Sequence, residues 1–259
     1  PVPAATVQTI RSLCEPEAKF WTPYGATECL PVAVIEGEQL SLTRAGTEQG
    51  FGTCIGWPLP ENSVRLIQIR DEAIADWHDD LLVAQGEIGE VTVAGPSATD
   101  SYFRREQANQ LGKIREVLPQ GIERIVHRMG DLAWQDSQGR LWFCGRKSQR
   151  LQTGDGLLGT ENVEPIFNVH PAVKRSALVG IGTYGEQKPV LCIEREPANG
   201  MPEQQLRAEL LAIAGTYRHT QHIDTFLIHP GFPVDIRHNA KIGREQLTLW
   251  ATQKLAQAS

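Results

Sequence analysis

An aspartate and an arginine stand at the two ends of a predicted β-hairpin. Residues 132–134 and 141–143 are short apolar and aromatic runs, and residues 136–139 between them have the composition of a turn. Pairing of the two runs would bring Asp131, just before the first strand, close to Arg146, just after the second. A carboxylate accepts hydrogen bonds from both hydroxyls of a vicinal diol, and a guanidinium binds an oxyanion. The pair would suit the ribose and phosphate of a nucleotide, and an ordinary surface ion pair is the alternative.

The sequence Tyr24-Gly-Ala-Thr-Glu28 carries a second set of chemical groups. We predict that it forms a turn after a short aromatic strand at residues 20–22. A phenol ring can lie against a base, and a hydroxyl and a carboxylate can contact a phosphate and its Mg²⁺. A polar turn between two strands is the alternative.

A third candidate is Lys241, in a polar loop that precedes the last predicted helix. A lysine on its flexible stem is a suitable point charge for a phosphate or a carboxylate. The alternative is a basic loop that keeps this end of the chain soluble.

Three further motifs lack a part that their chemistry requires. The glycines of residues 180–185 have the spacing of a dinucleotide-binding loop, but a turn and a strand follow them instead of a helix, so we predict a hairpin loop. Residues 154–160 have glycines spaced like those of a P-loop but no lysine before the hydroxyl residue. His219 and His222 have the spacing of one helix face without a third metal ligand.

The bulk composition is that of an ordinary globular protein. Of the 259 residues, 41% are hydrophobic and 22% are charged, and the net charge of −6 disfavours a nucleic-acid-binding protein. The five cysteines are scattered without a C-x-x-C pair, which predicts reduced thiols and a cytoplasmic protein. No apolar run reaches membrane-spanning length, and no signal peptide opens the sequence.

The first part of the chain is predicted to be mostly β. Strands are expected at residues 30–35, 63–69 and 89–95, and Gly/Pro turns between such short strands predict a small barrel or a curled sheet. Helices are expected at residues 4–13 and 106–118.

The second part begins after residue 147, where helices and strands alternate. Its first helix is predicted to be capped by Thr160, and a final amphipathic helix is predicted at residues 245–255. This is the pattern of a small α+β domain. The fold class is therefore α+β, with a domain boundary between residues 147 and 148.

The order of these motifs resembles the adenylate-forming superfamily, which includes acyl-CoA synthetases, luciferases and peptide-synthetase adenylation domains. The resemblance covers essentially the whole chain. It rests on the runs Tyr24-Gly-Ala-Thr-Glu28, Gly86-Glu-Ile-Gly-Glu90, Gly130-Asp-Leu, Gly145-Arg-Lys and Lys241-Ile-Gly-Arg244. Within the superfamily, residues 22–33, 139–147 and 233–242 are most similar to the β-lactone synthetases of bacterial long-chain olefin biosynthesis.

The resemblance implies which part of a longer enzyme this chain represents. Residues 1–147 would be the C-terminal part of a large AMP-binding domain with a β-rich, barrel-like remnant, and residues 148–259 would be the small mobile C-terminal domain. Most of the large domain and its Ser/Thr/Gly-rich phosphate loop are missing, and the chain begins with proline. We therefore expect the 259 residues alone to be inactive in adenylation.

The resemblance also implies residue roles for nucleotide binding. Tyr24 would lie against the adenine, with Gly25 in the same motif, and Thr27 would contact phosphate. Asp131 would accept both ribose hydroxyls, and Arg146 would contact the ribose side of the nucleotide.

Catalysis is implied at Lys241, Thr27 and Glu28. Lys241 would bridge the substrate carboxylate and the α-phosphate, and Glu28 would hold Mg²⁺. Ser148 stands where the superfamily places its hinge between domains.

The implied reaction uses ATP and Mg²⁺ to activate a 2-alkyl-3-hydroxy fatty acid as an acyl-adenylate. The β-hydroxyl of the substrate then displaces AMP and closes a β-lactone. Assembly with other enzymes of the olefin pathway is also implied, whereas a membrane span or a nucleic-acid partner is not expected. No base for the ring closure is identified, although His127 lies near the relevant stretch.

Two alternatives remain open. A fatty acyl-CoA synthetase would use the same nucleotide motifs, but Asp155 and Leu157 replace the glycine and the basic residue that line the thiol passage in thioester-forming members. A non-catalytic interaction module is the other alternative. Such a module would have no need of all four residues Glu28, Asp131, Arg146 and Lys241.

Overall fold

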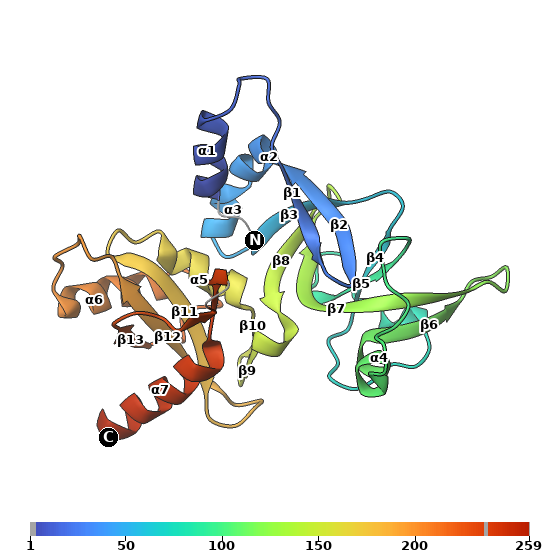
Figure 1. Cartoon of the computed structure of the whole chain (residues 1–259). Helices are drawn as coiled ribbons and strands as arrows, with labels where there is room; N and C mark the ends of the chain where they lie inside the picture. The colour runs from blue at the N-terminus through green and yellow to red at the C-terminus, as the bar shows by residue number, and fades with distance from the viewer. Residues whose placement is uncertain (1–3, 236–237, 259) are drawn as a thin grey trace. The chain divides into compact units, whose positions relative to one another are not determined.

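The computed structural model describes residues 4–235 and 238–258. It consists of two compact units, which are described separately (Figure 1). Unit 1 comprises Pro1–Gly46 and Gly52–Ser148, and unit 2 comprises Thr47–Phe51 and Gln149–Ser259. The chain passes from unit 1 to unit 2 for the last time between residues 148 and 149, which is one residue after the boundary expected from the sequence. The short segment Thr47–Phe51 was not expected in unit 2.

Unit 1 is built on one antiparallel sheet of eight strands. Its strand order is β1-β2-β3-β8-β7-β5-β4, and β6 pairs with β7. The predicted α+β class is confirmed, but the strand path is open, so within the described residues the barrel-like remnant is a sheet and not a closed barrel. The elements that begin in this unit are α1 (Ala4–Ser12), β1 (Trp21–Ala26), β2 (Cys29–Glu36), α2 (Gly37–Leu42), α3 (Arg44–Glu48), β3 (Thr53–Pro58), β4 (Ser63–Ile67), η1 (Asp79–Leu81), β5 (Gly89–Ala94), α4 (Glu106–Gly112), β6 (Lys113–Val117), β7 (Glu123–Gln135), β8 (Leu141–Arg146) and η2 (Lys147–Gln149).

The predicted hairpin is formed by β7 and β8. Asp131 and Arg146 are register partners on the two strands. The turn is fixed by Asp136, whose Oδ1 accepts hydrogen bonds of 2.9 Å from the backbone N–H groups of Gln138 and Arg140. An aspartate that accepts from its own turn is a common device for reversing a chain. The local pattern therefore predicted this element and its pairing correctly.

Three predictions for unit 1 are wrong in detail. β1 continues to Ala26, so Tyr24 and Gly25 are strand residues and only Thr27 and Glu28 form the turn. The predicted helix at residues 106–118 ends at Gly112, and β6 follows, because buried Ile114 and Glu116 alternate with exposed residues at the period of a strand. The helices α2 and α3 lie in a stretch that was predicted to be mostly β.

Unit 2 has a three-stranded sheet with helices on both faces. β11 (Val173–Ile181) pairs antiparallel with β12 (Lys188–Arg195), which pairs parallel with β13 (Thr225–His229). The other elements are β9 (Leu151–Thr153), β10 (Gly156–Leu158), α5 (Thr160–Asn168), α6 (Glu203–Ala214), β14 (Val234–Asp235), β15 (His238–Ile242) and α7 (Arg244–Ala258). Residues 182–187 connect β11 to β12, so the glycine motif at residues 180–185 lies at the end of β11 and in a hairpin loop, as predicted.

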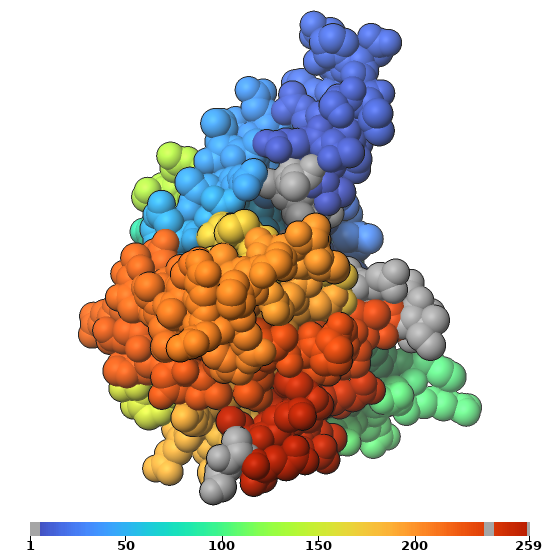
Figure 2. All heavy atoms as spheres, turned by 90° about the vertical axis from the view of Figure 1, so that its left-hand side faces the viewer, coloured from blue at the N-terminus to red at the C-terminus, as the bar shows by residue number. Residues whose placement is uncertain are grey.

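Alternate strand residues of this sheet face different helices. Leu178 and Leu191 belong to the core cluster of α5 and α6, whereas Val179 and Val190 belong to that of α7. Burial of both faces accounts for the apolar runs at residues 177–179 of β11 and 190–193 of β12. Figure 2 shows part of this unit from outside, with α6 in orange and α7 in red. Thr160 is the first residue of α5 and not its N-cap, which is Gly159.

Candidate functional site

The phenol of Tyr24 and the carboxylate of Asp131 meet in unit 1. Tyr24 Oη, from β1, donates a hydrogen bond of 2.8 Å to Asp131 Oδ2, on β7. Asp131 is 4% exposed, and its Oδ1 has no hydrogen-bond partner within the described residues. Arg146 Nε lies 3.5 Å from that oxygen, and the Arg146 side chain is 53% exposed. One carboxylate oxygen is therefore held by a hydrogen bond, and the other is buried with only the ion pair to Arg146.

Burial governs the ionisation of this pair. Burial raises the pKa of Asp131, and the charge of Arg146 and the hydrogen bond from Tyr24 oppose that rise. Burial and the adjacent carboxylate raise the pKa of Tyr24 well above its usual value, so the phenol remains a donor. A buried acceptor without a partner costs about 1–3 kcal/mol. A ligand with hydroxyl donors, such as a ribose diol, would offset that cost, so the site fits a nucleotide.

The turn between β1 and β2 presents Thr27 and Glu28. Thr27 is exposed, whereas Glu28 is half-buried and its Oε1 accepts a hydrogen bond of 3.1 Å from Tyr102 Oη. Gly25 lies just before this turn, and a Cβ built on it would come within 2.4 Å of the carbonyl oxygen of Cys29. Glycine is therefore required for the close approach of the two strands.

The donor set of the turn fits a nucleotide-bound magnesium ion. Mg²⁺ is usually bound by one or two carboxylates together with substrate phosphates. In the described part of the chain, no three His, Cys, Asp or Glu side chains gather to form a complete metal site. Glu28 would therefore act with phosphate oxygens and not within an all-protein cage.

Of the residues around Glu28, sequence reasoning named only His127 and missed Tyr102 and Lys113. Lys113 Nζ donates to the carbonyl and the hydroxyl of Thr99, and Tyr102 lies edge-on to His127 with ring centroids 6.4 Å apart. His127 is 3% exposed, and its Nδ1 lies 3.0 Å from the carbonyl oxygen of Gly112. Tyr102 comes from a loop and Lys113 from β6, so no local pattern in the sequence marks them.

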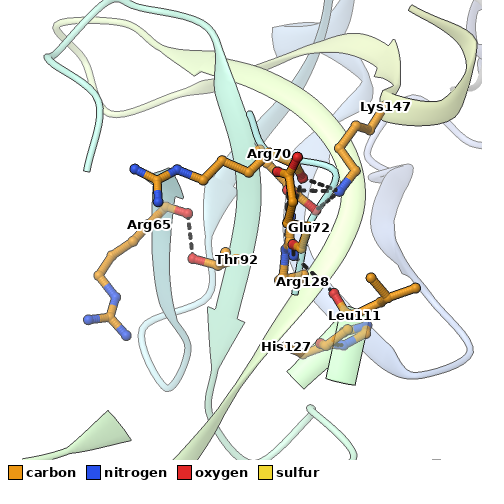
Figure 3. A network of polar contacts seen from close by, with 10 residues as sticks. Arg65, Arg70, Glu72, Thr92, Leu111, His127, Arg128 and Lys147 are labelled. Atoms are coloured by element: carbon orange, nitrogen blue, oxygen red, sulfur yellow. Dashed lines mark hydrogen bonds and ion pairs between the residues drawn. The ribbon is translucent and has the colours of Figure 1, made fainter. Parts of the chain in front are cut away.

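A buried polar network fixes β7 next to the site (Figure 3). The side chains of Arg128 and Glu90 are each 1% exposed and form an ion pair of 2.6 Å. Arg128 also donates to the backbone carbonyls of Arg70, Glu72 and Leu111. Lys147 Nζ lies 3.0 Å from Glu90 Oε1 and donates to the Arg70 carbonyl. The network thus holds the residue that precedes Ser148.

Lys241 and Ser148 are placed by other elements. Lys241 is an exposed residue of β15 in unit 2. Three residues later, Arg244 makes a bidentate ion pair with Glu164 of α5, at 2.5 and 2.9 Å. Ser148 lies in the short 3-10 helix η2 and is the last residue of unit 1. Unit 1 brings together Tyr24, Asp131 and Arg146. Lys241 belongs to unit 2.

Two curated proteins match nearly the whole chain. The chain is 55% identical over 255 residues, 98% of its length, to the olefin beta-lactone synthetase of Xanthomonas campestris pv. campestris. It is 56% identical over 256 residues to the olefin beta-lactone synthetase of Stenotrophomonas maltophilia. The chain is a close relative of the olefin beta-lactone synthetases. It spans 46% of the length of each of these two relatives.

Solved structures show the same fold. The amide bond synthetase McbA from Marinactinospora thermotolerans has a TM-score of 0.69 at 20% identity, over 96% of this chain and 44% of McbA. The o-succinylbenzoate CoA synthetase of Bacillus subtilis, solved with ATP and a magnesium ion, has a TM-score of 0.66 at 22% identity, over 95% of this chain and 44% of that one. No family model matches the chain. The predicted resemblance to the adenylate-forming superfamily is confirmed over the region that the chain covers.

Two predictions from composition can be compared with the structure. All five cysteines are free thiols, and Cys14 alone among them is exposed. None of the described helices combines the length and the apolar character needed to cross a membrane.

Proposed function

We propose that the full-length protein carrying this chain is an ATP-dependent ligase that converts a 2-alkyl-3-hydroxy fatty acid into a β-lactone. The identity of 55–56% to two olefin beta-lactone synthetases supports the reaction class. The observation that carries the nucleotide part is the buried carboxylate of Asp131, with one oxygen held by Tyr24 and the other without a hydrogen-bond partner within the described residues.

The first step joins the acid to AMP. A carboxylate oxygen of the acid attacks the α-phosphorus of ATP, and the bond between that phosphorus and the pyrophosphate oxygen breaks. In this proposal Tyr24 lies against the adenine, Asp131 accepts the ribose hydroxyls, and Arg146 contacts the same side of the nucleotide. Thr27 contacts phosphate. Lys241 bridges the attacking carboxylate and the α-phosphate and stabilises the charge that develops there.

The second step closes the ring. The β-hydroxyl oxygen attacks the acyl carbonyl carbon, the bond from that carbon to the AMP oxygen breaks, and the hydroxyl proton passes to a base or to water. The products are one β-lactone, one AMP and one pyrophosphate per hydroxy acid and ATP. Mg²⁺, held by Glu28 and the phosphates, would neutralise phosphate charge.

Two units suit a two-step reaction. In the proposal, residues 148–259 form a mobile domain that turns about Ser148 and delivers Lys241, while residues 1–147 belong to the domain that holds ATP. The network around Lys147 supports this choice, because it fixes the chain immediately before Ser148. We also propose that the protein is cytoplasmic and that it assembles with other enzymes of olefin biosynthesis.

The deciding experiment supplies the full-length protein with ATP, Mg²⁺ and a β-hydroxy fatty acid, with and without CoA. We expect a β-lactone, detected by mass spectrometry, in equal amounts under both conditions. A CoA thioester as the main product would establish the alternative, a fatty acyl-CoA synthetase. This alternative is considered because the chain is 27% identical over 177 residues to a long-chain-fatty-acid–CoA ligase of Salmonella typhimurium.

A further inference from the structure

We propose that Tyr102 is a positioning residue for Glu28, holding one carboxylate oxygen so that the other remains available to the divalent cation of the bound nucleotide. This inference rests on the proposed function, because Glu28 as a cation ligand belongs to that proposal. Tyr102 itself lies outside every motif that the sequence singled out. Its hydroxyl donates to Glu28 Oε1 at 3.1 Å, and Oε2 has no hydrogen bond within the described residues.

Tyr102 is held both at its backbone and at its ring. Asn109 of α4 clamps the Tyr102 backbone: its Oδ1 accepts from the Tyr102 N–H at 2.6 Å, and its Nδ2 donates to the Tyr102 carbonyl at 3.1 Å. The ring lies edge-on to His127, which is buried on β7. A hydroxyl held in this way can fix the orientation of the Glu28 carboxylate. The hydroxyl of a mobile surface tyrosine would move together with the carboxylate and would not fix it.

The backbone of Glu28 is fixed by the same group of residues. The Thr99 N–H donates to the Glu28 carbonyl at 2.8 Å. Lys113 in turn binds Thr99 and lies 5.4 Å from the centroid of the Tyr102 ring. Lys113 is 9% exposed, and its charge interacts with that of Glu28. Side chain and main chain of Glu28 are therefore both restrained before any ligand binds.

Restraint of this kind has a measurable effect on metal binding. Removing a hydrogen-bond partner of a ligating side chain typically weakens metal affinity by about 10–100-fold, because the ligand loses its orientation. Tyr102→Phe removes the one hydroxyl and keeps the ring against His127. The substitution should therefore act on the cation and leave the nucleotide contacts of Asp131 and Tyr24 in place.

The test measures binding in the full-length protein. The affinity for Mn²⁺, read by electron paramagnetic resonance, is determined in the presence of a non-hydrolysable ATP analogue, and calorimetry gives the affinity for the same analogue without metal. We expect Tyr102→Phe to weaken Mn²⁺ binding about tenfold, with unchanged affinity for the metal-free analogue. In the Glu28→Gln background, Tyr102→Phe should have no further effect on the metal. Tyr217→Phe makes the same chemical change in unit 2 and should alter neither affinity.

The outcomes separate the inference from the proposed function. Unchanged Mn²⁺ affinity in Tyr102→Phe overturns the positioning role. An equal loss for the metal-bound and the metal-free analogue also overturns it, because Tyr102 would then support the whole site. If the wild-type protein binds no ATP analogue at all, the proposed function fails, and the inference fails with it.

Discussion

Tyr24 and Asp131 are joined by a hydrogen bond of 2.8 Å although 107 positions separate them in the chain. Their strands are not neighbours, because β2, β3 and β8 lie between β1 and β7 in the sheet. In a flat sheet, four strand spacings would place them about 19 Å apart. The sheet must therefore curl until β1 approaches β7. The cluster that contains Val32 of β2 and Met129 of β7 fills the inside of that curl. The curl, without closure into a barrel, forms the candidate site.

Asp131→Asn should weaken nucleotide binding without destabilising the protein. Hydrogen bonds to a charged group contribute about 1.5–3 kcal/mol, so losing the charge should raise the Kd for Mg-ATP by about tenfold to a hundredfold. Burial raises the pKa of Asp131, so the ionised carboxylate is costly in the folded state. A neutral amide should therefore leave the thermal midpoint unchanged or raise it. Calorimetric titration and thermal unfolding measure the two quantities.

The matched control is Asp80→Asn, an exposed aspartate of the same unit. It should change neither the Kd nor the midpoint. Wild-type affinity for Mg-ATP in Asp131→Asn would show that this carboxylate does not contact the ligand.

Elements that depend on residues close together in the sequence were predicted correctly. Contacts between residues far apart in the sequence were missed. The β7–β8 hairpin follows from its apolar runs and the turn at Asp136, all within about twenty residues. Tyr102 and Lys113 reach Glu28 only through the folded sheet, so their role has no local signal. Arg128 also has no local signal in the sequence. Its burial depends on Glu90 and on carbonyls from the irregular segment near residue 70.

Arg128→Met should strongly destabilise unit 1. The substitution removes the guanidinium that donates two hydrogen bonds to Glu90 Oε2, and breaking a buried ion pair costs about 3–5 kcal/mol. Urea unfolding should give a free energy of unfolding that is lower by about that amount, and therefore a lower midpoint concentration. The double variant Arg128→Met/Glu90→Leu should recover part of the loss, because it also removes the buried carboxylate, while Lys147 loses its ion pair with Glu90.

Arg115→Met is the control for this network. Arg115 pairs with two carboxylates, but its side chain is 54% exposed. Ion pairs between exposed side chains contribute little to stability because water and salt screen them, so the urea midpoint should hardly move. Equal losses in Arg115→Met and Arg128→Met would contradict the importance given to burial.

Glu194 should make the stability of unit 2 depend on acid pH. Burial opposes ionisation, but hydrogen bonds from Lys174, the Phe232 N–H and Arg175 together lower the pKa of Glu194 to about 2. A lowered carboxyl pKa stabilises the folded state above the unfolded value, near 4.5. That stability is lost as pH falls through the folded value. Wild-type unfolding free energy should therefore fall between pH about 4.5 and about 2.

Glu194→Gln should flatten that part of the profile and lower the stability at pH 7. Glu186→Gln, an exposed carboxyl of the same unit, should keep the wild-type profile. A Glu194→Gln profile parallel to the wild type would mean that Glu194 does not titrate abnormally.

Substitutions at Lys241 and at Arg244, three residues apart, should separate an effect on catalysis from an effect on stability. Lys241 is exposed, so Lys241→Ala should leave thermal unfolding unchanged. In the full-length protein it should lower the rate of pyrophosphate release about a hundredfold, as loss of one group that stabilises developing charge does. Arg244 pairs with buried Glu164 and donates to the Leu178 carbonyl. Arg244→Ala should therefore cost about 3–5 kcal/mol of stability. Pyrophosphate release that survives Lys241→Ala would show that this lysine is only a surface charge, because the fold would be intact in that variant.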